Sequence, residues 1–299
     1  MKVKLGVAPI AWSNDDMPEL GGDTSLEQCL AEASKAGFTG VEYGGKFPRT
    51  SNLLIPKLKE FNLNLCSGWY GAQLLKRSVK EEIQFMQQQL TLFKDCQSPC
   101  MVFAEVTNSI QGDASAPLSK RLILNKDEWK SLINKINEIS LYMEDQGMPL
   151  AYHHHMGTVI QTEEDTYRLI ENTKESVHLL IDTGHMLFAG GDYLKITKDL
   201  AARIKHVHCK DMRKSILERA LKNDYSFRQA FLEGAFTVPG DGCIDYEPFL
   251  KILKENNYSG WVVVEAEQDP AKANPFEYSK KGYDYLSSKL KKTGFEIIS

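Results

Sequence analysis

Short apolar segments alternate with helical patterns along the whole chain, and this alternation is the feature that most restricts its fold. Each apolar segment is rich in Val, Ile, Leu and Phe and is nearly continuously hydrophobic, as expected for strands buried on both faces. Eight such segments stand at Val3–Pro9, Gly40–Tyr43, Leu63–Trp69, Met101–Val106, Leu150–His153, His178–Asp182, Ile204–His208 and Trp261–Glu265.

The segments between the strands have the spacing of amphipathic helices. After Asn125, apolar side chains from Trp129 to Met143 recur every three or four residues, which is the period of one helix face. Thr24-Ser-Leu-Glu27 has the spacing of a capping box and predicts a helix start. Eight strand–helix units in 299 residues predict a (β/α)8 TIM barrel with parallel strands and right-handed crossovers. A doubly wound open sheet is the alternative, but no G-x-G-x-x-G follows the first strand.

The connection from Lys210 to Trp261 is too long for a single crossover helix. We therefore expect a helical insertion after strand seven, at Ser215–Glu233, followed by a turn at Pro239-Gly-Asp-Gly242 and then the crossover helix. Because composition does not shift along the chain and no linker is evident, we expect a single barrel domain over residues 1–299.

Charge and composition exclude several classes of protein. With 36 Lys+Arg against 40 Asp+Glu and a net charge of -4, the chain lacks the basic surface that nucleic-acid binding requires. No apolar run approaches the ~20 residues that a membrane span needs, and the segment after Met1 lacks the features of a signal peptide. The six cysteines form no CxxC pair, which is typical of free thiols and predicts a cytoplasmic location.

Polar residues close nearly every predicted strand. The C-terminal strand ends are where barrels of this kind carry their chemistry, and buried charges are costly unless they are paired or bound to a metal. Converging Asp, His and Glu therefore predict a divalent metal site, and mixed nitrogen and oxygen ligands suit Mn, Co, Fe or Zn better than Ca or Mg. These strand-end residues are Trp12 to Asp16, Glu42, Trp69, Glu105, His153 to His155, Asp182 with His185, His208 with Lys210 and Asp211, and Glu265 with Glu267.

All seven histidines lie between His153 and His208, in the fifth, sixth and seventh predicted strands and the segments next to them. His154, His178 and His206 fit structural roles better than ligand roles. His178 begins its strand at the opposite end of the barrel, and His206 fits a hydrogen-bonded core histidine. Asp182 has a structural alternative as well, because it stands where it would cap the following helix.

The order of these motifs resembles the xylose-isomerase-like barrels. That superfamily carries Asp-x-x-His on strand six, as at Asp182 to His185, and His-x-Lys-Asp on strand seven, as at His208 to Asp211. It also has Glu at the end of strand eight, where Glu265 stands. Its members include sugar epimerases, endonuclease IV-type enzymes and dehydratases of cyclic polyols.

The start of the chain narrows this resemblance. The segment Gly6-Val-Ala-Pro-Ile-Ala-Trp12-Ser-Asn14-Asp15-Asp16-Met-Pro-Glu19 is similar to the opening of the inosose dehydratases of inositol catabolism. The similarity extends from the first strand to the last, and this opening is its most specific part. Further similar blocks are Phe103-Ala-Glu105-Val-Thr, Tyr152-His-His-His155-Met-Gly-Thr158, His206-Val-His208-Cys-Lys210-Asp211-Met-Arg213 and Glu265-Ala-Glu267-Gln-Asp269-Pro270.

The resemblance implies a lyase that removes water from 2-keto-myo-inositol (scyllo-inosose) to give a trihydroxycyclohexane-1,2-dione, with Mn or Co as its metal. Glutathione is also associated with the family, although no residues of this chain indicate a site for it. Asp182, His208 and Glu265 match three of the superfamily's metal ligands. The fourth is usually Glu at the tip of strand five, where this chain has His153. Either His153 ligates, or water or substrate takes that position.

Dehydration of a ketone requires a general base, a general acid and a Lewis acid that stabilises the enolate. We expect His185 or Lys210 to transfer protons, with Glu105 and His155 as further catalytic candidates. The expected substrate contacts are Trp12, Asn14, Asp15, Glu42 and Arg213, although Arg213 fits a surface position at the start of the insertion equally well.

Other functions share parts of this pattern. A metal-dependent keto-sugar epimerase or isomerase would use the same motifs on strands six and seven, whereas a DNA-repair enzyme would need more ligands and a basic groove. A catalytically inactive sugar-binding barrel would not need every ligand-type residue. The resemblance implies a small cyclic polyol ketone as the partner, and neither nucleic acid nor membrane is expected. The sequence leaves open whether the chain forms a homo-oligomer.

Overall fold

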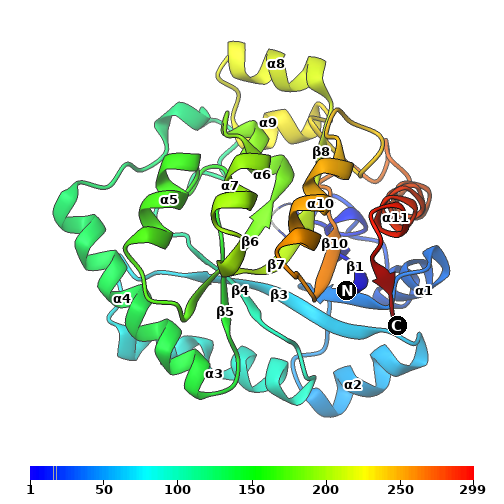
Figure 1. The fold of residues 1–299 in the computed structure, drawn as a ribbon, viewed down its shortest axis with the longest axis horizontal. Coiled ribbons are helices and arrows are strands. Elements are labelled where there is room, and N and C mark those ends of the chain that lie inside the picture. Colours follow the sequence, from blue (N-terminus) through cyan, green and yellow to red (C-terminus); the bar gives the residue numbers. More distant parts are fainter. Residues whose placement is uncertain (16, 18) are drawn as a thin grey trace.

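The computed structural model describes residues 1–15, 17 and 19–299, so Asp16 of the expected polar loop lies outside the described residues. Its centre is a closed barrel of parallel strands, in which each strand pairs with its neighbour and the last pairs with the first (Figure 1). The predicted (β/α)8 barrel is confirmed. The barrel strands are β1 (Lys2–Val7), β2 (Gly40–Tyr43), β3 (Asn64–Ala72), β4 (Met101–Glu105), β5 (Leu150–His153), β6 (Val177–Asp182), β7 (Ile204–Cys209) and β10 (Trp261–Val264).

Helices surround the barrel, and side-chain caps fix where several of them begin (Figure 1). Asn125 accepts a hydrogen bond from the Glu128 N–H at 3.0 Å, and the Glu128 carboxylate accepts one from the Asn125 N–H at 2.8 Å. The capping box predicted at Thr24 is wrong, because Ser25 is the residue that caps the helix there. The helices are α1 (Leu26–Ala36), α2 (Ser51–Glu60), α3 (Val79–Asp95), α4 (Lys126–Asp145), α5 (Glu163–Glu171), α6 (Thr183–Phe188), α7 (Tyr193–Asp199), α10 (Tyr246–Glu255) and α11 (Pro275–Lys292).

Outside the insertion, the described part of the chain also contains three short 3-10 helices and a C-terminal strand. The strand β11 (Glu296–Ile297) pairs in parallel with β1 and brings the two termini close together (Figure 1). Within the described part of the chain, no helix combines the length and apolar character that crossing a membrane requires. The 3-10 helices are η1 (Pro9–Ala11), η2 (Leu118–Lys120) and η3 (Ala201–Arg203).

The predicted helical insertion after strand seven is confirmed. A two-stranded antiparallel ribbon of β8 (Asp211–Met212) and β9 (Phe236–Thr237) encloses two helices, α8 (Lys214–Lys222) and α9 (Phe227–Leu232). Both helices lie together at the top of Figure 1, outside the ring of barrel helices. The insertion is thus a small unit added at one end of the barrel.

Asp211 anchors the return of the insertion to the barrel. Its buried carboxylate accepts hydrogen bonds from the backbone N–H groups of Met212, Gly240, Gly242 and Ile244 at 2.8 to 3.3 Å. A Cβ at Gly242 would lie 2.2 Å from an Asp211 carboxylate oxygen, so the turn requires glycine there. The strand-end Asp211 therefore has a structural role.

Aromatic side chains of the insertion cover the strand ends. The Phe227 ring lies 5.2 Å from the His155 ring and 5.7 Å from the His185 ring, between centroids. The Phe236 ring lies 5.4 Å from His185. These contacts place an apolar cover over one side of the polar residues at the C-terminal end of the barrel.

Candidate active site

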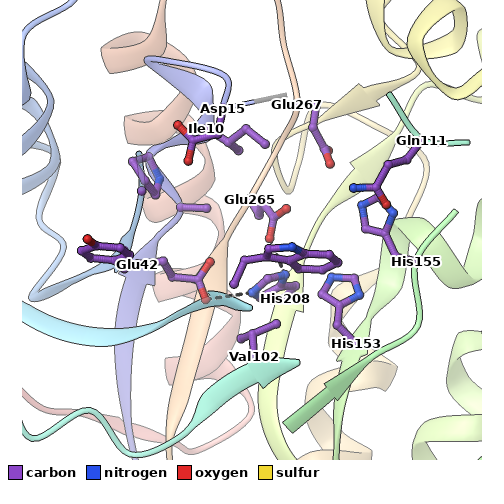
Figure 2. Close-up of a pocket in the computed structure, with 15 residues that line it drawn as sticks. Ile10, Asp15, Glu42, Val102, Gln111, His153, His155, His208, Glu265 and Glu267 are labelled. Carbon is purple, nitrogen blue, oxygen red and sulfur yellow. Dashed lines mark hydrogen bonds and ion pairs between the residues drawn. The ribbon is translucent and has the colours of Figure 1, made fainter. Parts of the chain in front are cut away.

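A cavity of about 130 Å³ opens at the C-terminal ends of the barrel strands (Figure 2). Apolar side chains such as Ile10, Trp69 and Val102 form part of its wall, and carboxylates and imidazoles form much of the rest. An apolar wall with a few converging polar groups is typical of a small-molecule site. The described residues that line the cavity are Ala8, Pro9, Ile10, Asp15, Glu42, Tyr43, Gly44, Trp69, Val102, Gln111, His153, His155, His208, Glu265 and Glu267.

Four buried residues from four strand ends bring ligand-type atoms together beneath this cavity. His153 ends β5, Asp182 ends β6, His208 lies near the end of β7, and Glu265 follows β10. One nitrogen or oxygen atom from each lies within 4.8 Å of those from the others. Asp182 Oδ2 is 3.5 Å from His208 Nδ1 and 3.6 Å from His153 Nε2, and His208 Nδ1 also contacts Glu265 Oε2.

Three of these atoms have no hydrogen-bond partner among the described residues: Asp182 Oδ2, His208 Nδ1 and Glu265 Oε2. Leaving buried polar atoms unsatisfied costs free energy, so such atoms are rarely left without a purpose. Two imidazoles and two carboxylates match the ligand preferences of Mn, Fe, Co or Zn. The four residues therefore fit a divalent metal ion.

Hydrogen bonds on the far side of each imidazole orient the two histidines for this role. His208 Nε2 lies 3.0 Å from Glu42 Oε1, and His153 Nδ1 lies 2.6 Å from the His154 carbonyl oxygen. Since ionised carboxylates and carbonyls only accept, these two nitrogens carry the protons. Burial would lower the pKa of His208, but the nearby Glu265 and Glu42 carboxylates raise it well above its ordinary value. A metal ion would replace the proton on His208 Nδ1, which faces Asp182 as His153 Nε2 does, and the hydrogen bond at the far nitrogen of each ring selects the tautomer that metal binding needs.

Glu42 lies behind His208 and collects three donors on one oxygen. Its Oε1 atom is 3.0 Å from His208 Nε2 (Figure 2). The same atom lies 3.0 Å from His206 Nε2 and accepts the Ser67 hydroxyl. Burial alone would raise the pKa of Glu42, but the charge of His208 and the hydrogen bonds from both histidines hold it well below its ordinary value. An ionised Glu42 therefore fixes His208, while the side chain also borders the cavity.

Lys210 is completely buried and surrounded by acceptors. Its Nζ atom lies 2.7 and 2.8 Å from the two Glu267 oxygens, 2.9 Å from His185 Nε2 and 3.0 Å from Glu265 Oε1. Burial disfavours the charged form, but Glu265, Glu267 and Asp182 raise the pKa of Lys210 above its ordinary value. Because an ammonium only donates, His185 Nε2 accepts, and burial holds the pKa of His185 well below its ordinary value.

His155 faces the cavity as a neutral imidazole. Burial lowers its pKa well below the ordinary value for histidine. His155 Nδ1 lies 2.8 Å from the Met156 carbonyl oxygen, so this nitrogen carries the proton. His155 Nε2 is left as a proton acceptor, and Figure 2 shows the ring beside Gln111 and above His153.

Six of the residues predicted for the site line the cavity, and Asp182, His185 and Lys210 lie directly behind it, in contact with the lining residues. Two predicted substrate contacts at the start of the chain do not line it. Trp12 is fully buried and donates its indole N–H to Glu32 at 2.6 Å. Asn14 is also buried and accepts a hydrogen bond from the Met17 N–H at 3.0 Å. Both side chains shape the loop that presents Asp15 to the cavity.

Glu105 and Arg213 are also placed differently from the prediction. The Glu105 carboxylate accepts the backbone N–H groups of Leu74 at 2.5 Å and Thr107 at 2.7 Å, so both oxygens hold loops in place. Arg213 pairs with Asp241 at 2.8 Å and contacts the insertion, away from the cavity. Both side chains are directed away from the cavity because they form hydrogen bonds with backbone groups of nearby loops.

Sequence reasoning missed the roles of Gln111 and Glu267, which line the cavity, and the aromatic cover beside it. Gln111 comes from the loop after β4, and its Oε1 atom is buried without a partner among the described residues. No local pattern singles out such a loop residue. Glu267 was noted as a strand-end carboxylate but given no role, although it shares the face of Glu265 two residues earlier. For the apolar cover formed by Phe227 and Phe236, the sequence gives no indication other than the length of the insertion.

Known proteins resemble this chain over nearly its whole length. Residues 30–296 match the family described as xylose isomerase-like TIM barrel. An inosose dehydratase of Clostridium beijerinckii is 45% identical over 296 residues, covering 98% of this chain and 98% of that protein. The rhizopine catabolism protein MocC of Rhizobium meliloti is 44% identical over 299 residues, covering 100% and 92%. The solved structure of an IOLI protein with a bound zinc atom covers 97% of this chain and 98% of that one, with a TM-score of 0.65 and 17% identity.

Proposed function

The chain belongs to the inosose dehydratases of the xylose isomerase-like TIM barrel family, and we propose that it acts at a divalent metal centre. It is a hydro-lyase of inositol catabolism that removes water from 2-keto-myo-inositol to give a trihydroxycyclohexane-1,2-dione. The observation that carries the metal-dependent part is the convergence of buried ligand-type atoms from Asp182, His208 and Glu265 that make no hydrogen bond among the described residues.

His153, Asp182, His208 and Glu265 would hold the ion, with Mn or Co as the proposed metal. The mixed nitrogen and oxygen donors support this choice over Ca or Mg. A bound ion would polarise the ketone oxygen and stabilise the negative charge that develops on it when the neighbouring C–H is deprotonated.

Residues on the cavity wall supply the proton transfers in this proposal. His155 Nε2 faces the cavity with a free lone pair and takes the proton from the carbon next to the ketone. The Lys210–Glu267 pair, which reaches the cavity through Glu267, delivers a proton to the hydroxyl that leaves as water. His185 accepts from Lys210 at 2.9 Å and holds its ammonium in position.

The polyol ring is held between the apolar wall and polar groups at the cavity mouth. Asp15 and Gln111 offer carboxylate and amide oxygens to ring hydroxyls. Asp15 is itself fixed by the Gly45 N–H, which donates to its carboxylate at 2.7 Å. The cover formed by Phe227 and Phe236 keeps water from the Lys210 side of the site.

Replacing Gln111 by leucine is expected to raise KM for the inosose about fivefold with a much smaller change in kcat. The orphan Gln111 oxygen would lose one hydrogen bond to the substrate, worth about 1 kcal/mol, at a point away from the reacting atoms. Steady-state kinetics measures both constants. Gln88→Leu makes the same change on an exposed helix face and serves as the control. A fall in kcat with unchanged KM in Gln111→Leu would contradict a binding role.

The deciding experiment incubates the metal-reconstituted protein with 2-keto-myo-inositol and Mn and follows the absorbance of the dione. Dione formation that stops on chelation and returns with Mn or Co is the expected result. Formation of a keto-sugar isomer without loss of water would instead assign an epimerase or isomerase, the alternative that shares the same motifs.

Glutathione and the cellular location are the two remaining expectations from the sequence. The lining of the cavity includes no Lys or Arg among the described residues to pair with the carboxylates of glutathione, and the proton transfers proposed above do not require that tripeptide. A reducing, cytoplasmic location remains part of the proposal and is supported by the cysteines, all six of which are free thiols.

A further inference from the structure

A second set of metal-type residues lies beside the first. His155, His185 and Glu267 each offer one ligand-type atom, and these atoms lie within 4.8 Å of one another. All three residues are buried. They are distinct from the group of His153, Asp182, His208 and Glu265. Lys210 lies between the two groups, because its ammonium contacts Glu265 of the first and His185 of the second.

The Lys210 ammonium contacts two members of this second set, His185 and Glu267. Its nitrogen lies within 2.9 Å of His185 Nε2 and of both Glu267 oxygens. It also lies 3.0 Å from Glu265 Oε1, whereas Glu265 Oε2 is directed at His208 and the first group. Glu265 thus turns one oxygen toward each position, as a carboxylate does when it bridges two cations.

We propose that Lys210 is a built-in second cation that limits the centre to one divalent ion. The position enclosed by His155, His185, Glu267 and Glu265 would otherwise bind a second ion of the same kind. This inference rests on the metal centre of the proposed function. It adds a role for Lys210 that proton transfer alone does not require.

Charge and space both support this role. A divalent ion at the second position would be repelled by the Lys210 ammonium, which is fully buried and cannot turn out into solvent. Its nitrogen holds the surrounding acceptors at 2.7 to 3.0 Å, whereas metal–ligand bonds are about 2.0–2.2 Å long. The site therefore combines one Lewis acid with one proton-bearing cation, which suits a reaction in which a hydroxyl must be protonated as it leaves.

Counting bound ions tests this role directly. Protein stripped with a chelator is incubated with excess Mn, desalted and analysed for Mn per chain. We expect one ion in the wild type and two in Lys210→Ala, which vacates the position and leaves its carboxylates without a cation. Lys210→Met should hold one ion because its side chain still fills the space, and Lys210→Ala combined with Glu267→Gln should return to one.

Two further readouts make the count specific. A pair of Mn ions bridged by Glu265 would give a spin-coupled electron paramagnetic resonance signal in Lys210→Ala that the wild type lacks. Lys135→Ala is the matched control, because Lys135 is a part-buried lysine whose ammonium donates to the backbone carbonyls of Leu74 and Arg77. It should keep one ion and show no coupled signal.

The outcomes separate this inference from the metal centre itself. A natively folded Lys210→Ala that holds one ion overturns the second-cation role alone, and a wild type that holds no ion overturns the metal centre of the proposed function. If Lys210→Ala does not fold, titration of the wild-type protein with Mn still decides. One binding event supports the role, and a second event within the barrel, lost in Glu267→Gln, overturns it.

Discussion

Replacing Asp182 by asparagine is expected to abolish metal retention and to lower kcat/KM by at least about 10³-fold, while the barrel stays folded. A Lewis acid contributes several kcal/mol to a reaction of this kind, and each 1.36 kcal/mol corresponds to about a factor of ten. Asp182 Oδ1 accepts the His185 N–H at 2.8 Å and caps α6, a contact that the asparagine carbonyl can keep. Only Oδ2, which faces His153 and His208, becomes an amide donor that repels a cation.

The matched control for this change is Asp192→Asn. Asp192 caps α7 in the same way, by accepting the N–H groups of Leu194 and Lys195, but it lies on the surface. Elemental analysis should find Mn lost from Asp182→Asn and retained in Asp192→Asn, with native circular dichroism in both. Activity and bound Mn both retained in Asp182→Asn would show that the ligand set is wrong.

The fold could be predicted because its determinants are local. Two strands, Gly40–Tyr43 and Leu150–His153, have the bounds expected from their apolar runs, and most of the others differ by only one or two residues at either end. The largest difference is β3, which continues to Ala72 past the expected end at Trp69 because its later residues pair with β4. Helix starts are less certain from sequence, as Ser25 shows, because two adjacent hydroxyl residues can each cap a helix and only the backbone direction decides.

The candidate site was likewise predictable only where its residues are placed by local determinants. Residues at strand ends, such as His208 and Glu265, were predictable because the barrel places those ends around one opening. The same rule misplaced Glu105, whose carboxylate turns to backbone donors of neighbouring loops. Gln111 lies on a loop whose path depends on contacts far along the chain, including the Ile110 N–H donating to the Gly157 carbonyl. The spacing of residues in the sequence cannot predict such long-range contacts.

Hydrogen bonding explains why so many histidines are compatible with one metal centre. Each imidazole near the site has one nitrogen committed to a fixed acceptor or donor, and this commitment decides what the other nitrogen can do. His153 Nε2 and His208 Nδ1 face Asp182, where a metal ion would bind, His155 presents a lone pair to the cavity, and His185 accepts from Lys210. The roles of the histidines therefore follow from their neighbours and not from their spacing in the sequence.

Replacing Glu42 by glutamine is expected to weaken Mn binding about 10- to 100-fold, the usual effect of removing the group that orients a metal-binding histidine. Glutamine keeps one carbonyl oxygen but loses the charge that draws His206, His208 and Ser67 together. His208 then lacks the fixed partner that holds its proton on Nε2. Calorimetric titration with Mn measures the affinity, and kcat at saturating Mn should largely recover because Glu42 acts through His208.

Glu82→Gln provides the control, because Glu82 is another buried carboxylate that accepts from Tyr70 at 2.5 Å and from the Gln73 N–H at 3.0 Å, away from the metal position. It should leave the Mn affinity unchanged even if it lowers the melting temperature. A raised KM for the inosose in Glu42→Gln, with Mn affinity unaltered, would contradict the positioning role. That result would favour the substrate contact expected from the sequence, since Glu42 also borders the cavity. The two roles are therefore distinguished by which binding is weakened when the carboxylate is lost: that of the metal for a positioning role, or that of the polyol for a substrate contact.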